Sequence, residues 1–142
     1  MSGTDAVLWS DPSMWLDYVD LPTGWIRPDA VIRSGSTRSG MPAGLQLICG
    51  VGPYELEVLV QDLERDGRLE FAGQVTKTGC VMEPVRDLAI ELVCAVRRPP
   101  VASTRTDVYG EFDLNSGRDA AYAIRLGQGD DAPCVAVWEE VR

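Results

Sequence analysis

Histidine is absent from this 142-residue sequence, and lysine occurs only as Lys77. Without histidine the chain cannot build a Cys–His pair or a Ser-His-Asp triad, which are common ways to activate a nucleophile. The sequence also lacks both glycine-rich phosphate motifs, G-x-x-x-x-G-K-[ST] and a G-x-G-x-x-G that opens a helix. We therefore expect no catalytic residues and no cofactor. A hydrolase that uses only carboxylates remains as an alternative.

The cysteine spacing of a metal site is also missing. No two of the four cysteines are separated by the two to four residues of a zinc site; they are Cys49, Cys80, Cys94 and Cys134. Their spacing leaves disulfides open, whereas a cytosolic location favours reduced thiols.

The main group of acidic residues is Asp107, Glu111 and Asp113, three carboxylates within seven residues. Calcium prefers oxygen ligands, but this spacing is not that of an EF-hand loop. The alternation of polar and apolar residues points Glu111 and Asp113 into water. We expect a solvated strand face here and no metal site.

Basic residues are scarce: 13 stand against 22 acidic ones, for a net charge of −9. Binding to nucleic acid needs a basic surface that displaces counterions, and none is visible. No window of the sequence approaches the run of about 18 apolar residues that spans a membrane. The N-terminus also lacks the basic start and apolar run of a secretory signal. The sequence therefore predicts a cytoplasmic protein that binds neither nucleic acid nor membranes.

Residues 1–44 differ in pattern from the rest and are predicted to form an N-terminal arm. Within it, Asp11 is suited to cap a short helix over residues 11–20, with Pro12 at the first helical position. Glycine and serine dominate residues 34–44, a composition typical of a flexible linker.

Large aromatic and sulfur-containing side chains gather in this arm. Such residues anchor many protein interfaces, so we take them as candidate partner-binding residues. They are Trp9, Met14, Trp15, Tyr18 and Trp25. The alternative is that they cover one face of the domain that follows.

From residue 45 the apolar period changes to two, as in YELEVLV (54–60), where Leu56, Val58 and Val60 share one face. Strands separated by turn signals, without intervening helices, predict that residues 45–142 form an all-β, antiparallel β-sandwich. The predicted strands are 45–51, 54–60, 68–75, 87–96, 101–108, 111–115, 120–126 and 134–141. The dipeptides Arg97-Arg98 and Pro99-Pro100 are expected to form a loop.

The segment TRTDVYGEFDL (104–114) predicts a strand, a turn and a second strand, together a structural hairpin. Thr106 and Asp107 can accept hydrogen bonds from the backbone amides of the turn. Gly110 supplies a conformation that bulkier residues resist, and Phe112 is expected to fill the core. We interpret this motif as a structural element rather than as a functional site.

The segment 73–126 carries a wider pattern: Gly73 and Val75, then T-x-T-D-x-x-G-x-F-x-L from Thr104 to Leu114, then an alternating strand that begins at Tyr122. With these pieces it resembles the carboxypeptidase-regulatory-like, or transthyretin-like, β-sandwich domain. Residues 116–121, SGRDAA, replace the Pro-Gly usual before the last strand of that family.

Residues 31–75 are similar to the upstream half of small bacterial proteins with this sandwich. Those proteins are encoded beside extracytoplasmic-function sigma factors, often near caspase-like CHAT proteases. The resemblance implies a role in regulation or signalling and supplies no catalytic residues.

Together these observations predict a non-enzymatic protein-interaction module in a bacterial regulatory or defence pathway. Its partner would be another protein, such as a sigma factor or a CHAT-type protease. The chief alternative is a structural or assembly subunit that forms homodimers or larger homo-oligomers by sheet pairing.

Overall fold

A computed structural model describes residues 24–34, 44–63, 67–79, 83–95, 97–117, 121–129 and 131–138. Every regular element in these ranges is a β-strand, so no helix there is long and apolar enough to span a membrane. In chain order the strands are β1 (Trp25–Ile26), β2 (Ala30–Ser34), β3 (Gly44–Val51), β4 (Tyr54–Leu63), β5 (Arg68–Lys77), β6 (Glu83–Pro84), β7 (Ala89–Cys94), β8 (Arg97–Arg105), β9 (Glu111–Ser116), β10 (Tyr122–Leu126) and β11 (Cys134–Trp138).

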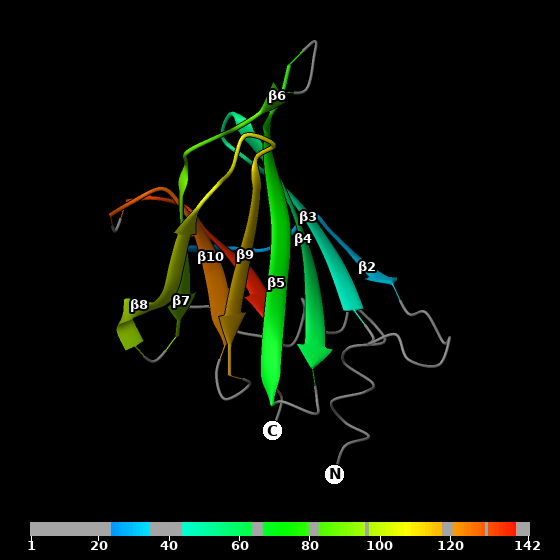
Figure 1. Ribbon diagram of the computed structural model, residues 1–142, viewed down its shortest axis with the longest axis vertical. Helices are drawn as coiled ribbons and strands as arrows, with labels where there is room; N and C mark the ends of the chain where they lie inside the picture. The colour runs from blue at the N-terminus through cyan, green and yellow to red at the C-terminus, as the bar shows by residue number, and fades with distance from the viewer. Residues whose placement is uncertain are drawn as a thin grey trace.

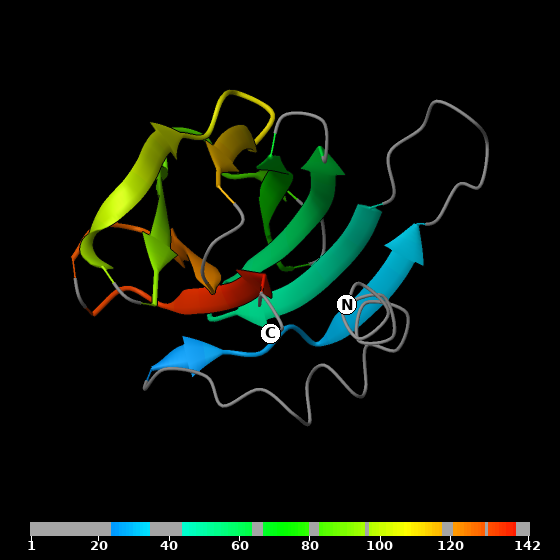
Figure 2. The same ribbon diagram turned by 90° about the horizontal axis from the view of Figure 1, so that it is seen from below.

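The strands form two sheets that face each other across the core (Figure 1, Figure 2). The five-stranded sheet has the order β1-β11-β10-β7-β8. The six-stranded sheet has the order β2-β3-β4-β5-β6, and β9 also pairs with β5. The described strands pair antiparallel, except that β1 runs parallel to β11. The prediction of an all-β, sandwich-like architecture is confirmed for the described residues.

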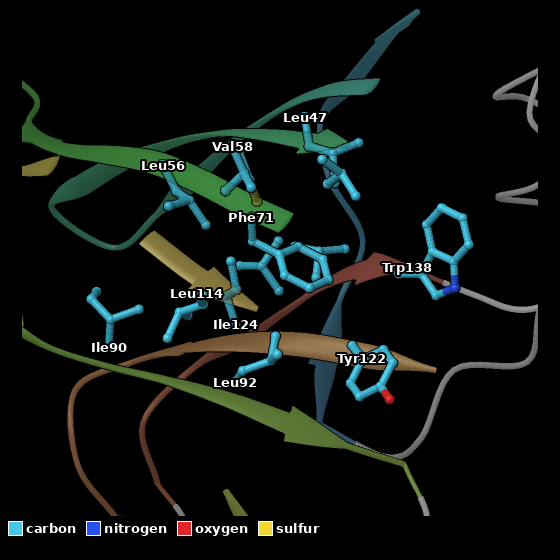
Figure 3. Packing of buried hydrophobic residues seen from close by; sticks show 14 of the residues in the cluster. Leu47, Leu56, Val58, Phe71, Ile90, Leu92, Leu114, Tyr122, Ile124 and Trp138 are labelled. Atoms are coloured by element: carbon cyan, nitrogen blue, oxygen red, sulfur yellow. The ribbon is translucent and has the colours of Figure 1, made fainter. Parts of the chain in front are cut away.

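The core lies between the sheets and is built from the alternating apolar residues of both. Phe71 on β5 and Tyr122 on β10 meet edge to face, with their ring centroids 6.4 Å apart (Figure 3). Leu56 from the six-stranded sheet and Leu92 from the five-stranded sheet are almost completely buried in the same cluster. Burying each such side chain stabilises the fold by about 1.5–3 kcal/mol.

The strands begin before residue 45, because β1 and β2 lie inside the segment predicted as the arm. β2 pairs with β3 along five residues, and β1 pairs with β11. On β1, the half-buried Trp25 packs against Val93, Ala123 and Cys134 of the five-stranded sheet. β1 has only two residues, and β2 (AVIRS) groups its apolar residues instead of alternating them with polar ones, so neither strand shows the pattern by which strands are recognised in a sequence.

The predicted helix over residues 11–20 lies outside the described residues. Four candidate partner-binding residues do so as well: Trp9, Met14, Trp15 and Tyr18.

The expectation of a loop at residues 97–100 is wrong, since β8 runs from Arg97 to Arg105. β8 is the edge strand of its sheet, where a proline can sit without removing a ladder hydrogen bond. Pro99 and Pro100 also fall where the pairing with β7 shifts, between Leu92 and Cys94. The prolines therefore occupy an irregular stretch of an edge strand.

Gly73 on β5 leaves space for the ring of Phe112, its cross-strand neighbour on β9. A Cβ atom at Gly73 would lie 2.3 Å from Cζ of Phe112 and 2.9 Å from the backbone oxygen of Glu57. Such distances are impossible without movement of the ring or the backbone. Because Gly73 has no side chain, the ring of Phe112 can lie over β5, where it fills this part of the core.

Gly73→Ala is expected to lower the free energy of unfolding by about 2 kcal/mol, because the added methyl group overpacks the core. Urea titration followed by circular dichroism measures this change. Gly50→Ala is the matched control, since a Cβ at Gly50 would meet only Oδ2 of Asp29, at 3.5 Å. Equal stability of the two variants would contradict the proposed role of Gly73.

Three cysteines of the described part, Cys49, Cys94 and Cys134, are free and buried. Burial, and next the nearby Asp29 carboxylate, raise the pKa of Cys49 above its ordinary value of 9.0. Both effects disfavour the thiolate, which is the reactive form.

Alkylation of Cys49 by iodoacetamide should therefore be slow in the folded protein at pH 8, and its rate should reach half-maximum above pH 9.0. Mass spectrometry of the peptide that contains Cys49 follows the reaction. The same chain unfolded in urea serves as the control and should react at the rate of an ordinary thiol. Equal rates in both states would show that the environment of Cys49 does not protect it.

Candidate functional site

The turn between β8 and β9 is held by the carboxylate of Asp107. Its Oδ1 accepts hydrogen bonds from the backbone N–H of Tyr109 at 2.9 Å and of Glu111 at 3.0 Å. The N–H of Gly110 donates to the backbone oxygen of Asp107 at 3.0 Å. Gly110 has a φ of 74°, in the left-handed region that favours glycine. The result is a tight, internally bonded turn.

Thr106 anchors this turn to the five-stranded sheet. It is 5% exposed, and its Oγ1 accepts a hydrogen bond from the N–H of Leu88 at 2.9 Å. The backbones of Thr106 and Leu88 are also bonded, at 3.0 Å. Beside them, Arg105 forms an exposed ion pair of 2.7 Å with Asp87.

The six-stranded sheet holds the other side of the turn. The N–H of Val75 donates to the backbone oxygen of Gly110 at 2.8 Å. The side-chain amide of Gln74 donates to the backbone oxygen of Tyr109 at 2.9 Å. The turn is therefore fixed to both sheets.

The segment predicted as a hairpin is a connection between the two sheets. β8 pairs with β7, whereas β9 pairs with β5, so the flanking strands belong to different layers. Thr106 bonds to the start of the β7 segment rather than to the turn amides. Phe112 is 6% exposed and belongs to the core cluster.

The tip of the turn exposes two large apolar side chains, Val108 and Tyr109, which are 60% and 63% exposed. This pair is not among the residues predicted from the sequence to bind a partner. A signal was present, since Val108 and Tyr109 stand together at the centre of a turn, where polar residues are usual.

A groove of about 890 Å³ extends from the turn over the outer face of the six-stranded sheet. Two rows of paired positions form its floor: Glu57, Gln74 and Glu111 in the first, and Leu59, Ala72 and Asp113 in the second. Arg105 and Asp107 line the side of the groove next to β8.

The groove carries an excess of negative charge. Four of its lining residues are acidic, Glu57, Asp107, Glu111 and Asp113, and Arg105 is the basic one. Arg105 is bonded through Nε to the Asp87 carboxylate and through a second nitrogen to the Asp87 backbone oxygen, both at 2.7 Å. The guanidinium therefore has its charge partner outside the groove.

Glu57 and Gln46 are directly bonded, with 2.7 Å between Nε2 of Gln46 and Oε1 of Glu57. A neutral amide orients this carboxylate without cancelling its charge. For Glu111 and Asp113, no ion pair with another described residue is present.

The structure brings Asp107, Glu111 and Asp113 to one side of the groove. Among the described residues, no group of three or more cysteine, aspartate or glutamate side chains is arranged to hold a metal ion. Asp107 is directed to backbone amides, while Glu111 and Asp113 are exposed on β9. The arrangement is suited to bind cationic groups by charge and hydrogen bonds.

Comparison with protein-family models, with curated proteins and with solved structures finds no match to this chain.

Asp107→Ala is expected to lower the free energy of unfolding by about 1–2 kcal/mol, because two backbone N–H groups lose their acceptor. Thermal or urea unfolding measures the loss. Asp113→Ala is the matched control on the neighbouring strand and should change stability by less than about 0.5 kcal/mol. If the two variants were equally stable, the carboxylate of Asp107 would not hold the turn.

Proposed function

We propose that this protein is a non-enzymatic protein-interaction module, and that the tip formed by Val108 and Tyr109 is its main contact. The observation that carries this proposal is the high exposure of both side chains on a turn fixed to both sheets. A rigid turn that exposes apolar side chains gains nothing for the fold. It is well prepared to bury them against a partner.

Two contributions to the binding free energy favour Tyr109 as an interface residue. Tyrosine is enriched among the residues that dominate protein interfaces, because its ring buries a large area with few rotatable bonds. The bonds of Asp107 and Gln74 hold the backbone around Tyr109 in place before binding. Less conformational entropy is then lost on association.

The resemblance of residues 73–126 to carboxypeptidase-regulatory-like domains supports a transthyretin-like arrangement of the sheets. The similarity of residues 31–75 to small bacterial proteins with this sandwich supports a cytoplasmic role in bacterial regulation or defence. In this proposal the partner is another protein, such as a sigma factor or a CHAT-type protease. Of the arm residues expected to bind the partner, Trp25 packs against the five-stranded sheet, so this proposal places the main contact at the tip instead.

A structural subunit that pairs through its sheets is the second candidate. It is favoured by the position of β2, which lies at the edge of the six-stranded sheet and pairs with β3 alone among the described strands. Such an edge can add a strand from a second copy of the chain.

Photocrosslinking tests the proposed function. With p-benzoylphenylalanine in place of Tyr109, irradiation in the native host should trap one defined partner, because the benzophenone lies at the exposed position of the tyrosine ring and reacts with C–H bonds close to it. Mass spectrometry identifies the product. A different protein supports the interaction module, whereas a second copy of this chain supports the structural subunit.

The control carries the same reactive residue in place of Ala95, which is exposed in the turn that follows the far end of β7. It should not trap the same partner. Identical products from both positions, or none from position 109, would contradict the role of the tip.

A further inference from the structure

We propose that the groove on the six-stranded sheet binds an extended, basic segment of the partner protein. This inference rests on the proposed function and adds the chemistry of the partner. The groove and the tip form one continuous surface, since Asp107 lines the groove and Gln74 of its floor bonds to Tyr109. A single ligand can therefore contact both.

The spacing of the carboxylates suits an extended chain. Glu111 and Asp113 lie two residues apart on β9 and face the same side, which places them about 6.5–7 Å apart along the strand. Side chains on one face of an extended peptide repeat at the same interval. Glu57 lies two strands away across Gln74, at about 10 Å from Glu111 by the usual strand spacing.

The floor of the groove suits long basic side chains. Leu59 and Ala72 are half-buried neighbours on β4 and β5, between Gln46 and Asp113 in one row. The aliphatic stems of arginine and lysine pack on such apolar surface while their charged ends stay in polar surroundings. Here the ends would reach the carboxylates of Glu111 and Asp113.

The negative charge of the groove favours a basic partner over two other possible ligands, a second copy of this chain and its own residues 1–23. A second copy of this chain carries the same net charge of −9, so the groove repels it. Residues 1–23 contain four aspartates and no lysine or arginine, so charge does not favour them either. In the floor, the backbones of β4 and β5 are paired on both sides, so recognition there proceeds through side chains rather than by strand addition.

Fluorescence anisotropy with the full chain tests this inference. The probes are a fluorescein-labelled peptide of alternating arginine and serine and its counterpart with glutamate in place of arginine. The arginine peptide should bind and the glutamate peptide should not, and added salt should weaken the binding. Glu111→Gln with Asp113→Asn should raise the Kd of the arginine peptide about tenfold.

The control must separate the groove from the overall charge. Glu83→Gln with Asp131→Asn removes two exposed carboxylates that do not line the groove. Both double variants have a net charge of −9 + 2 = −7. The control should bind the arginine peptide within about twofold of the original chain. An equal loss in both variants would show attraction by net charge alone and overturn the inference, as would equal binding of the two peptides or no binding of either.

The two proposals fail separately. If position 109 traps a partner but the arginine peptide does not bind, the interaction module stands and the basic segment is wrong. If the peptide binds in the groove but position 109 traps nothing, the groove stands as a binding site and the role of the tip is lost.

Discussion

The connection between β8 and β9 is the constraint on which the rest of this structure depends. Here the chain leaves one sheet and enters the other within a few residues, and each step of the passage is bonded. Thr106 secures it to the five-stranded sheet, and Gly110 secures it to the six-stranded sheet. A change in this passage would shift the two layers relative to each other, because both are tied to it.

The same passage couples the core to the surface. Phe112 follows Gly110 by two residues and lies over Gly73, where any side chain would collide with its ring. Glu111 and Asp113, on the other face of β9, are thereby placed in the floor of the groove. A packing contact on the inner face thus positions the charges on the outer face.

Charge and apolar exposure are unevenly distributed over this surface. The acidic residues of the six-stranded sheet gather around Leu59 and Ala72, the apolar part of the groove floor, and the neighbouring Arg105 forms an ion pair with Asp87. On such a surface, charge would steer a partner toward the groove, and burial of Val108 and Tyr109 at the tip would stabilise the complex. The proposed module therefore needs no reactive group, only a firmly supported shape and an excess of one sign of charge.

Alternation in the sequence was sufficient to predict most of the strands, because a strand with one buried face must repeat its apolar residues every second position. β4, β5 and β9 lie close to their predicted ranges for this reason. β1 and β2 were missed, because β1 has two residues and the sequence of β2, AVIRS, groups its apolar residues instead of alternating them with polar ones. Pro99-Pro100 concealed only the first residues of β8, an edge strand whose backbone tolerates proline.

The groove could not be predicted from the sequence. Its rows join residues of β4, β5 and β9 that are up to 56 positions apart, from Glu57 to Asp113, and only the pairing register brings them side by side. By itself the sequence determined which residues must avoid water, since hydrophobicity is a property of each side chain. The tertiary structure alone decided which exposed residues meet, because that depends on how distant strands pair and where the chain crosses between the sheets.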